Sequence, residues 1–457
     1  MAANPDAAQP AAQPATMSKL ARRTALLLPL GMAGCSLFDG TFFGADKPPL
    51  PGKRIDVMAQ TDPLVTGAPH AGRVVLPPPA PNASWAQAGG NPAHDMEHPA
   101  LGANLAPVWR VKIGSGGGYR AKLTAQPVVA GGRVFTMDSD AVIAAFDAAS
   151  GSRVWRRDTR GKHDQSTNIG GGIALDGTTL YAATGRGDVL AIAAATGHIL
   201  WRQSIGSPAR SAPTVAEGKL FVPTLSGKLL ALSAADGKPV WSFESAGAAT
   251  TVLGLPAPAY ADGIVVAGFG SGELVALRAA SGAVSWSDSL ASAGGRNSLA
   301  DLSTIRGRPV IRDGRVYAVG IGRLMVALDL RSGRRLWERS IASYETPWIA
   351  GDWLFVLDQQ DVLAAISAID GNVAWTTQLP GFRNMKNHTD PIRWIGPLLA
   401  GDRLVVAGGN AEALAVSPYT GAIIGRQKLP GAASLSPVVA AGTLYLLTDD
   451  ATLTAFR

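Results

Sequence analysis

The chain has 457 residues, with 41 Lys and Arg against 34 Asp and Glu, a formal net charge of +7 and one cysteine. A balance this mildly basic, without a patterned basic helix, does not indicate nucleic-acid binding. A single cysteine excludes an intramolecular disulfide, so a folded domain in this chain has to be held together by packing.

The first 34 residues are typical of an export signal. Three basic residues between positions 19 and 23 precede an apolar run at 25–34 that is too short to span a bilayer stably. The residues before Met17 are rich in Ala, Pro and Gln, which indicates that the natural start is Met17. We therefore predict a signal peptide at 1–34.

The single cysteine, Cys35, lies where this signal ends. It follows Ala33-Gly34, as in a bacterial lipobox whose cysteine carries the lipid; the alternative is an ordinary signal with an incidental cysteine. Each buried methylene of a lipid contributes about 0.8 kcal/mol, so several acyl chains anchor a protein stably. Ser36, rather than Asp, follows the cysteine, and in this the chain resembles lipoproteins sorted to the outer membrane.

Residues 35–100 are rich in Pro, Gly and Ala, and include the run Leu76–Pro81. This composition favours a semi-extended tether that lets an anchored domain stand away from the membrane. The stretch Ser84–His94 is more specific than tether sequence, and we expect it to pack onto the domain that follows.

A phrase of Ala, an apolar residue, Gly and Trp at fixed spacing returns at intervals of about 45 residues. A seventh copy has Gly425 in place of the tryptophan, and an eighth is cut off at Arg457. Trp109 opens the repetitive region with no repeat before it, so we assign it to the eighth copy. The other repeat tryptophans are Trp155, Trp201, Trp241, Trp286, Trp337 and Trp375.

The pattern predicts an all-β fold at 101–457, an eight-bladed β-propeller with four antiparallel strands in each blade. In the first repeat, short apolar runs at 126–130, 133–137, 141–146 and 153–155 are separated by Gly or Asp turns. A strand from the start of the region is expected to complete the last blade, because a closed ring leaves no raw sheet edge.

Two further expectations concern positions within a blade. Small residues dominate the third strand, which suggests that this strand lies near the crowded axis of the ring. The tryptophan of the fourth strand is expected to fill the wedge between neighbouring blades and to be structural. Burying it removes roughly 150–250 Å² from water, so replacement by Ala should cost about 3–5 kcal/mol.

Candidate catalytic and metal-binding residues are few. His94 and His98 have the i, i+4 spacing of a helical metal site that Asp95 or Glu97 could complete, but the flanking prolines favour a solvated loop. His163, Asp164 and Ser166 are triad residue types without a nucleophile elbow. Three aspartates of one repeat leave a calcium site open, although turn formation explains them equally: Asp358, Asp361 and Asp370.

Signal, lipobox, tether and repeats together resemble the BamB family, lipoproteins of the outer-membrane β-barrel assembly machinery. The resemblance covers about 84–457 and is strongest at Val326–Trp337 and in the segment Asn297–Pro309. It implies contacts with the protein BamA in that segment and in the loop after the third repeat tryptophan. Where family members carry acidic or other contact residues, this sequence has Thr250, Val252, Leu253, Thr304 and Arg306.

The resemblance implies a non-catalytic scaffold, lipid-anchored on the periplasmic face of the outer membrane. Its partners would be BamA, the other Bam subunits and unfolded outer-membrane proteins, with no cofactor, metal ion or catalytic residue. The alternative is a periplasmic quinoprotein-like dehydrogenase or ligand binder that uses the central channel. The repeats resemble those of such enzymes, which carry pyrroloquinoline quinone, calcium and a disulfide of adjacent cysteines. This chain lacks the cysteine pair. An adhesion or cell-wall-binding propeller is a third possibility.

One repeat also carries an unusual number of arginines. Either they serve solubility or they contact an acidic partner: Arg306, Arg308, Arg312, Arg315 and Arg323.

Overall fold

The computed structural model describes residue 64 and residues 72–118, 121–161, 166–245, 254–291 and 304–457. The chain divides into two compact units, 1–60 and 61–457, and all described residues belong to the second. The predicted signal peptide, Cys35 and most of the predicted tether therefore lie outside the described residues. The described part contains strands and turns but no helix, and hence no helix able to cross a membrane.

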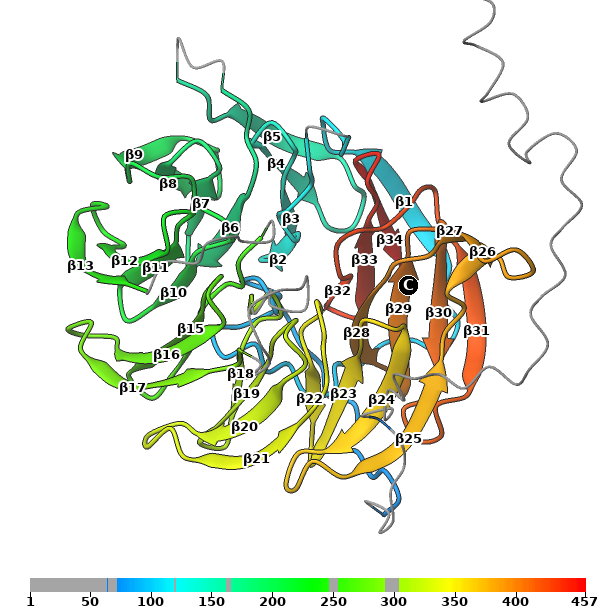
Figure 1. The fold of residues 1–457 in the computed structure, drawn as a ribbon. Coiled ribbons are helices and arrows are strands. Elements are labelled where there is room, and N and C mark those ends of the chain that lie inside the picture. Colours follow the sequence, from blue (N-terminus) through cyan, green and yellow to red (C-terminus); the bar gives the residue numbers. More distant parts are fainter. Residues whose placement is uncertain (1–63, 65–71, 119–120, 162–165, 246–253, 292–303) are drawn as a thin grey trace, which may run out of the picture. The chain divides into compact units, whose positions relative to one another are not determined.

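The strands form eight four-stranded antiparallel sheets arranged in a ring, which confirms the predicted eight-bladed propeller (Figure 1). Blades one to four follow the chain in order. They are β2 (Val128–Ala130), β3 (Arg133–Met137), β4 (Val142–Asp147) and β5 (Arg153–Asp158); β6 (Gly171–Asp176), β7 (Thr179–Thr184), β8 (Asp188–Ala193) and β9 (Ile199–Ser204); β10 (Thr214–Ala216), β11 (Lys219–Pro223), β12 (Lys228–Ser233) and β13 (Pro239–Glu244); and β14 (Ala259–Ala261), β15 (Ile264–Gly268), β16 (Glu273–Arg278) and β17 (Val284–Ser289).

Blades five to seven continue the series, and a small exposed hairpin precedes the seventh. They are β18 (Val310–Arg312), β19 (Arg315–Val319), β20 (Met325–Asp329) and β21 (Arg335–Arg339); β22 (Trp348–Ala350), β23 (Trp353–Leu357), β24 (Val362–Ser367) and β25 (Val373–Gln378); the hairpin β26 (Phe382–Asn384) and β27 (Thr389–Pro391); and β28 (Trp394–Ala400), β29 (Arg403–Gly408), β30 (Glu412–Val416) and β31 (Ile423–Lys428).

The eighth blade joins the two ends of the ring, as predicted. It consists of β32 (Val438–Ala440), β33 (Thr443–Leu447), β34 (Thr452–Phe456) and, as its outer strand, β1 (Pro107–Lys112). Trp109 of β1 pairs with Ala455 of β34, the register that each repeat tryptophan has in its own blade. The N-terminal strand thus covers a sheet edge that would otherwise be free to pair with another chain.

The innermost strand of each blade is the first one. Neighbouring blades contact each other near the axis through these first strands, for example β2 with β6 and β6 with β10. The third strand lies between the second and the fourth, so the prediction that it lies near the axis was wrong. Its small residues have another reason: the alanine of the repeat faces the tryptophan across the sheet, as in the pair Ala145–Trp155, next to a β-bulge.

The repeat tryptophans lie between neighbouring blades. Each indole covers the positive-φ glycine in the next blade's turn between its third and fourth strands; a Cβ on Gly197 would lie 2.6 Å from the ring of Trp155. Each indole N–H also donates to a carbonyl of that turn, as Trp241 Nε1 does to Ala279 O at 3.0 Å. One residue therefore joins two blades by both packing and a directional hydrogen bond.

A segment ahead of the ring contacts all eight blades. Trp85 is buried, forms two backbone hydrogen bonds with Val129 of blade one and stacks on Trp348 of blade six at 6.2 Å. Its neighbours bond to the other blades through backbone or side-chain atoms, with the partners Leu175, Val215, Tyr260, Ile311, Gly401 and Ala441. The stretch Ser84–His94 thus packs onto the ring as expected.

Candidate partner-binding site

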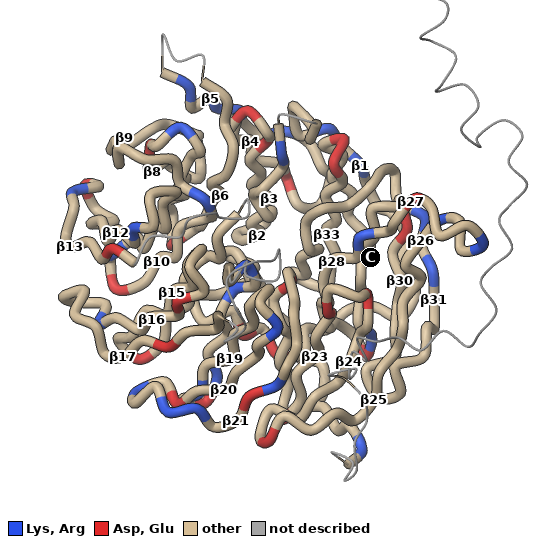
Figure 2. The backbone as a smooth tube through the Cα atoms, in the orientation of Figure 1, with Lys and Arg blue, Asp and Glu red and all other residues tan. Residues whose placement is uncertain are grey.

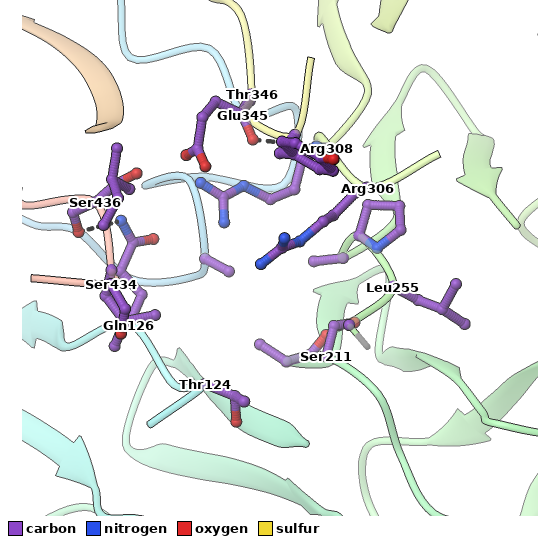
Figure 3. Close-up of a pocket in the computed structure, with 18 of the residues that line it drawn as sticks. Thr124, Gln126, Ser211, Leu255, Arg306, Arg308, Glu345, Thr346, Ser434 and Ser436 are labelled. Carbon is purple, nitrogen blue, oxygen red and sulfur yellow. Dashed lines mark hydrogen bonds between the residues drawn. The ribbon is translucent and has the colours of Figure 1, made fainter. Parts of the chain in front are cut away.

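A cavity of about 450 Å³ opens at the centre of the ring, where the loops that lead into the first strands of seven blades meet. Ala88 of the N-terminal segment also lines it and packs against Ala212 and Ala257. We call this cavity the ring mouth (Figure 3). On the far side of the cavity, residues 84–93 run across the first strands of the blades. We therefore describe the ring mouth as a pocket rather than as an open channel.

Positive charge dominates the ring mouth. Among the residues that the structure describes, five basic side chains line it, against the single carboxylate of Glu345. Figure 2 shows blue segments near the centre of the ring as well as around its outer edge. The basic residues come from the loops of four different blades: Lys122, Arg210, Arg306, Arg308 and Arg393.

An aromatic ring holds two of these arginines. The guanidinium carbons of Arg306 and Arg393 lie 5.6 Å and 5.4 Å from the ring centre of Tyr344, within the range of a cation–π contact. Arg393 also reaches the carboxylate of Glu345 at 3.7 Å. Two cations on one ring repel each other, so their neighbourhood favours a further negative charge.

Arg308 lies deepest and is only partly bonded. Its backbone N–H donates to Thr346 Oγ1 at 3.1 Å, while its Nε is shielded from water and has no hydrogen-bond partner. In Figure 3 the guanidinium groups of Arg306 and Arg308 both extend into the cavity from neighbouring positions of one loop. Burial lowers the pKa of Arg308 to about 10, so the group stays charged at neutral pH.

Glu345 balances only part of this charge. Its backbone N–H donates to Ser343 Oγ at 2.9 Å, and its carboxylate accepts from the backbone N–H of Gly396 at 3.4 Å. Burial raises the pKa of Glu345, although three arginines nearby act in the opposite direction. One carboxylate shared among Arg306, Arg308 and Arg393 leaves positive charge in excess.

The structure describes two of the five predicted contact residues, and it places them in different positions relative to the ring mouth. Thr250, Val252 and Leu253 lie outside the described residues. Thr304 is fully buried and donates its hydroxyl to Gly270 O at 3.0 Å, so its side chain does not face the ring mouth. Arg306 does, and its Nε lies near Gly254, the first described residue after the other predicted loop.

The arginines of the fifth repeat do not form one patch. Arg312 is bound to Asp95 and Glu97 of the N-terminal segment, and Arg315 donates to Ala368 O at 3.3 Å in the next blade. Arg306 and Arg308 alone among the five line the ring mouth. The sequence did not single out Arg210, Arg393, Lys122 and Glu345, although each lies just before or at the start of a first strand, a position that alignment of the repeats would have marked.

The two histidines are structural. His94 and His98 lie in a loop, as expected, but they are buried rather than solvated; their Nδ1 atoms lie 2.7 and 2.8 Å from the carbonyl oxygens of Pro309 and Pro77. His98 Nε2 accepts from the backbone N–H of Asp402 at 3.0 Å, so both ring nitrogens of His98 are engaged.

Two of the three predicted turn aspartates, Asp358 and Asp370, accept hydrogen bonds within turns. Asp358 accepts backbone N–H groups of Gln360 and Val362, both at 2.8 Å, and Asp370 accepts that of Asn372 at 3.1 Å. Asp358 and Asp370 flank opposite ends of β24, which spans about 20 Å, so they cannot share one ion. His163 and Asp164 lie outside the described residues.

The ring mouth does not suit calcium. Calcium takes six to eight oxygen ligands, usually with several carboxylates, whereas the described lining residues supply one carboxylate and five cations. No group of three His, Cys, Asp or Glu side chains able to hold a metal occurs within the described ranges. A disulfide of adjacent cysteines is excluded by the sequence, which has Cys35 alone.

Fold and repeats define a class, the eight-bladed propellers built from repeats of the quinoprotein type. Solved members of this class include the crystal structure of BamB from Moraxella catarrhalis, with a TM-score of 0.65, 20% identity and coverage of 78% of this chain and 100% of that one. A europium-containing methanol dehydrogenase has a TM-score of 0.67 and 12% identity, covering 82% and 98%. At these identities the likeness concerns the fold alone.

Sequence places the chain more narrowly. The family model described as outer membrane protein assembly factor BamB matches residues 105–168, 139–377 and 383–457. The BamB of Yersinia pestis is 30% identical over 356 residues, covering 76% of this chain and 88% of the relative. That of Escherichia coli is 27% identical over 351 residues, covering 76% and 87%. The chain belongs to the BamB family of outer-membrane protein assembly factors.

Proposed function

We propose that this chain is a non-catalytic scaffold of outer-membrane protein assembly. Lipid on Cys35 holds it on the periplasmic face of the outer membrane, and the ring binds BamA, joins the other Bam subunits and helps to deliver unfolded outer-membrane proteins. Family membership supports the assembly role, because the relatives are named as assembly factors.

The ring mouth is the observation that carries the binding part of the proposal. Loops of seven blades converge on one cavity, and a closed ring holds them rigidly in place. A partner can be recognised there through a few anchors, because a small number of central, desolvated contacts dominates most interfaces. Arg306 and Gly254, on or beside the two loops expected to contact BamA, lie together in this cavity.

Purification of the tagged, lipidated protein from mildly solubilised native membranes tests the proposal. Mass spectrometry should identify BamA and its partner lipoproteins, and Arg306→Gln should reduce their recovery. Arg334→Gln, which removes an exposed charge in the turn between β20 and β21, should leave it unchanged. Recovery of a dehydrogenase or cytochrome in place of BamA would contradict the proposal.

A thermal melt separates the scaffold from a quinoprotein-like enzyme. A ligand that binds only the folded state raises the melting temperature by mass action. Added quinone with calcium should therefore leave the melting temperature unchanged, and a rise of several degrees would favour the enzyme.

A further inference from the structure

We propose that the ring mouth binds an acidic peptide segment of a partner protein, with carboxylate side chains entering between Arg306 and Arg308. The inference rests on the proposed scaffold role only in taking the ligand to be a protein partner. The observations that carry it are the charge of the cavity, the incomplete bonding of its arginines and the composition of its wall.

Some arginines elsewhere on the ring are paired with carboxylates, whereas Arg306 and Arg308 of the ring mouth are not. Arg335 pairs with Asp288 at 2.7 Å and Arg202 with Asp188 at 2.6 Å. Within the described part of the chain, neither Arg306 nor Arg308 forms a salt bridge, and only Arg393 approaches Glu345. The chain thus places cations around a cavity and leaves them largely without counter-ions.

The Nε of Arg308 is the clearest case of incomplete bonding in the ring mouth. It is removed from water, it has no hydrogen-bond partner, and the guanidinium projects into the cavity (Figure 3). A shielded donor without an acceptor is costly, and an entering carboxylate would supply the acceptor and the missing negative charge together.

The wall favours a peptide over a small anion. Leu255, Pro256, Ile395 and Leu435 supply apolar surface beside the arginines, and Thr124, Ser434 and Ser436 also line the cavity. A volume of about 450 Å³ exceeds what one phosphate fills and suits several side chains. Ala88 and the segment that carries it lie on the inner side, which suits a loop or a chain end rather than a threaded strand.

Fluorescence anisotropy with the full-length processed protein tests the proposal. The probes are a labelled peptide that alternates Glu or Asp with Leu and its isosteric Gln and Asn counterpart, with inorganic phosphate as competitor. The acidic peptide should bind at least about tenfold more tightly, and added salt should weaken it. Equal affinity of the two peptides would overturn the proposal, and so would full displacement by low phosphate, which would show a small-anion site.

Matched variants locate the site. Arg308→Gln and, in case that variant folds poorly, Arg306→Gln should each weaken the acidic peptide about tenfold, since each removes a charge-assisted hydrogen bond. Glu345→Gln should strengthen binding because it removes the one carboxylate among the described residues that line the cavity. Arg334→Gln is the control and should leave affinity within about twofold; an equal loss in this control would show non-specific attraction and overturn the proposal.

The two proposals fail separately. Binding of acidic peptides without recovery of BamA from membranes would leave the ring mouth as an acidic-peptide site and refute the BamA assignment. Recovery of BamA with no preference for the acidic peptide would support the BamA assignment and refute the acidic-peptide site.

Discussion

Two glycines of the seventh repeat show how one residue type serves opposite purposes. Gly421 has φ of 74° and lies under Trp375, so that a Cβ would fall 2.6 Å from the indole. Gly425 stands where a tryptophan stands in the other repeats, and an added Cβ would meet only Ala415 at an ordinary 3.6 Å. The outer strand of the eighth blade is β1, so β34 is not joined to it by a glycine turn that a tryptophan at position 425 could cover.

Alanine at these two positions should have opposite effects. Gly425→Ala should raise the free energy of unfolding by about 0.5–1 kcal/mol, because it reduces the conformational entropy of the unfolded chain without a clash. Gly421→Ala should lower it by more than that. Denaturant titration of both variants measures the difference, and a destabilising Gly425→Ala would show that this position is more crowded than the structure indicates.

His94 predicts a pH dependence of stability. Burial, with the charge of Arg308 as a second cause, lowers the pKa of His94 from 6.5 to about 3. The unfolded chain therefore binds a proton more readily than the folded one, so the stability contribution is complete above pH 6.5 and is lost as the pH falls from 6.5 toward 3. At about pH 5 the loss should be about 2 kcal/mol.

Other groups titrate in the same range; burial raises the pKa of Asp361 to about 6, for example. A variant is therefore needed to isolate the effect of His94. Asn tolerates the φ of 60° at position 94 and its amide can donate to the carbonyl of Pro309. His94→Asn should therefore lose less stability than the wild type between pH 7 and pH 5. Parallel pH profiles would refute the assignment.

At the scale of elements, the segment around Trp85 clamps the ring. Its contacts reach all eight blades, so it resists the opening of any one of them. Trp85→Ala should lower the free energy of unfolding by about 3–5 kcal/mol, since Trp85 is buried and stacks on Trp348.

The control for this variant is Val75→Ala, which alters a side chain that is 70% exposed and should change stability little. If the free energy of unfolding of Trp85→Ala equalled that of the wild type, the segment around Trp85 would add nothing to the stability of the ring.

The sequence predicted the strands and their number well, because each repeat encodes its own turns and its own tryptophan. It misplaced the third strand, since the small residues there make room for the opposing tryptophan and do not reflect closeness to the axis. It also read His94 and His98 as solvated, because their burial depends on partners more than two hundred residues away, such as Pro309 and Asp402. The ring mouth was missed for a similar reason: its residues are single positions in separate repeats that only ring closure brings together.

At the scale of the whole molecule, the propeller separates stability from recognition. Packing between blades and the N-terminal clamp hold the ring, and the loops that meet at the ring mouth carry its basic side chains. Buried cations without counter-ions are tolerated where the remaining structure is rigid, and they are then available to a partner.

Site-specific photo-crosslinking in cells tests this account most directly. A photoreactive residue at Leu255, on the wall of the ring mouth, should crosslink to BamA. The same residue at Ile369, exposed in the turn at the end of β24, should not. Crosslinking to BamA from Ile369 but not from Leu255 would contradict the ring mouth as the docking site. So would a Leu255 variant that crosslinks to neither BamA nor any other Bam subunit.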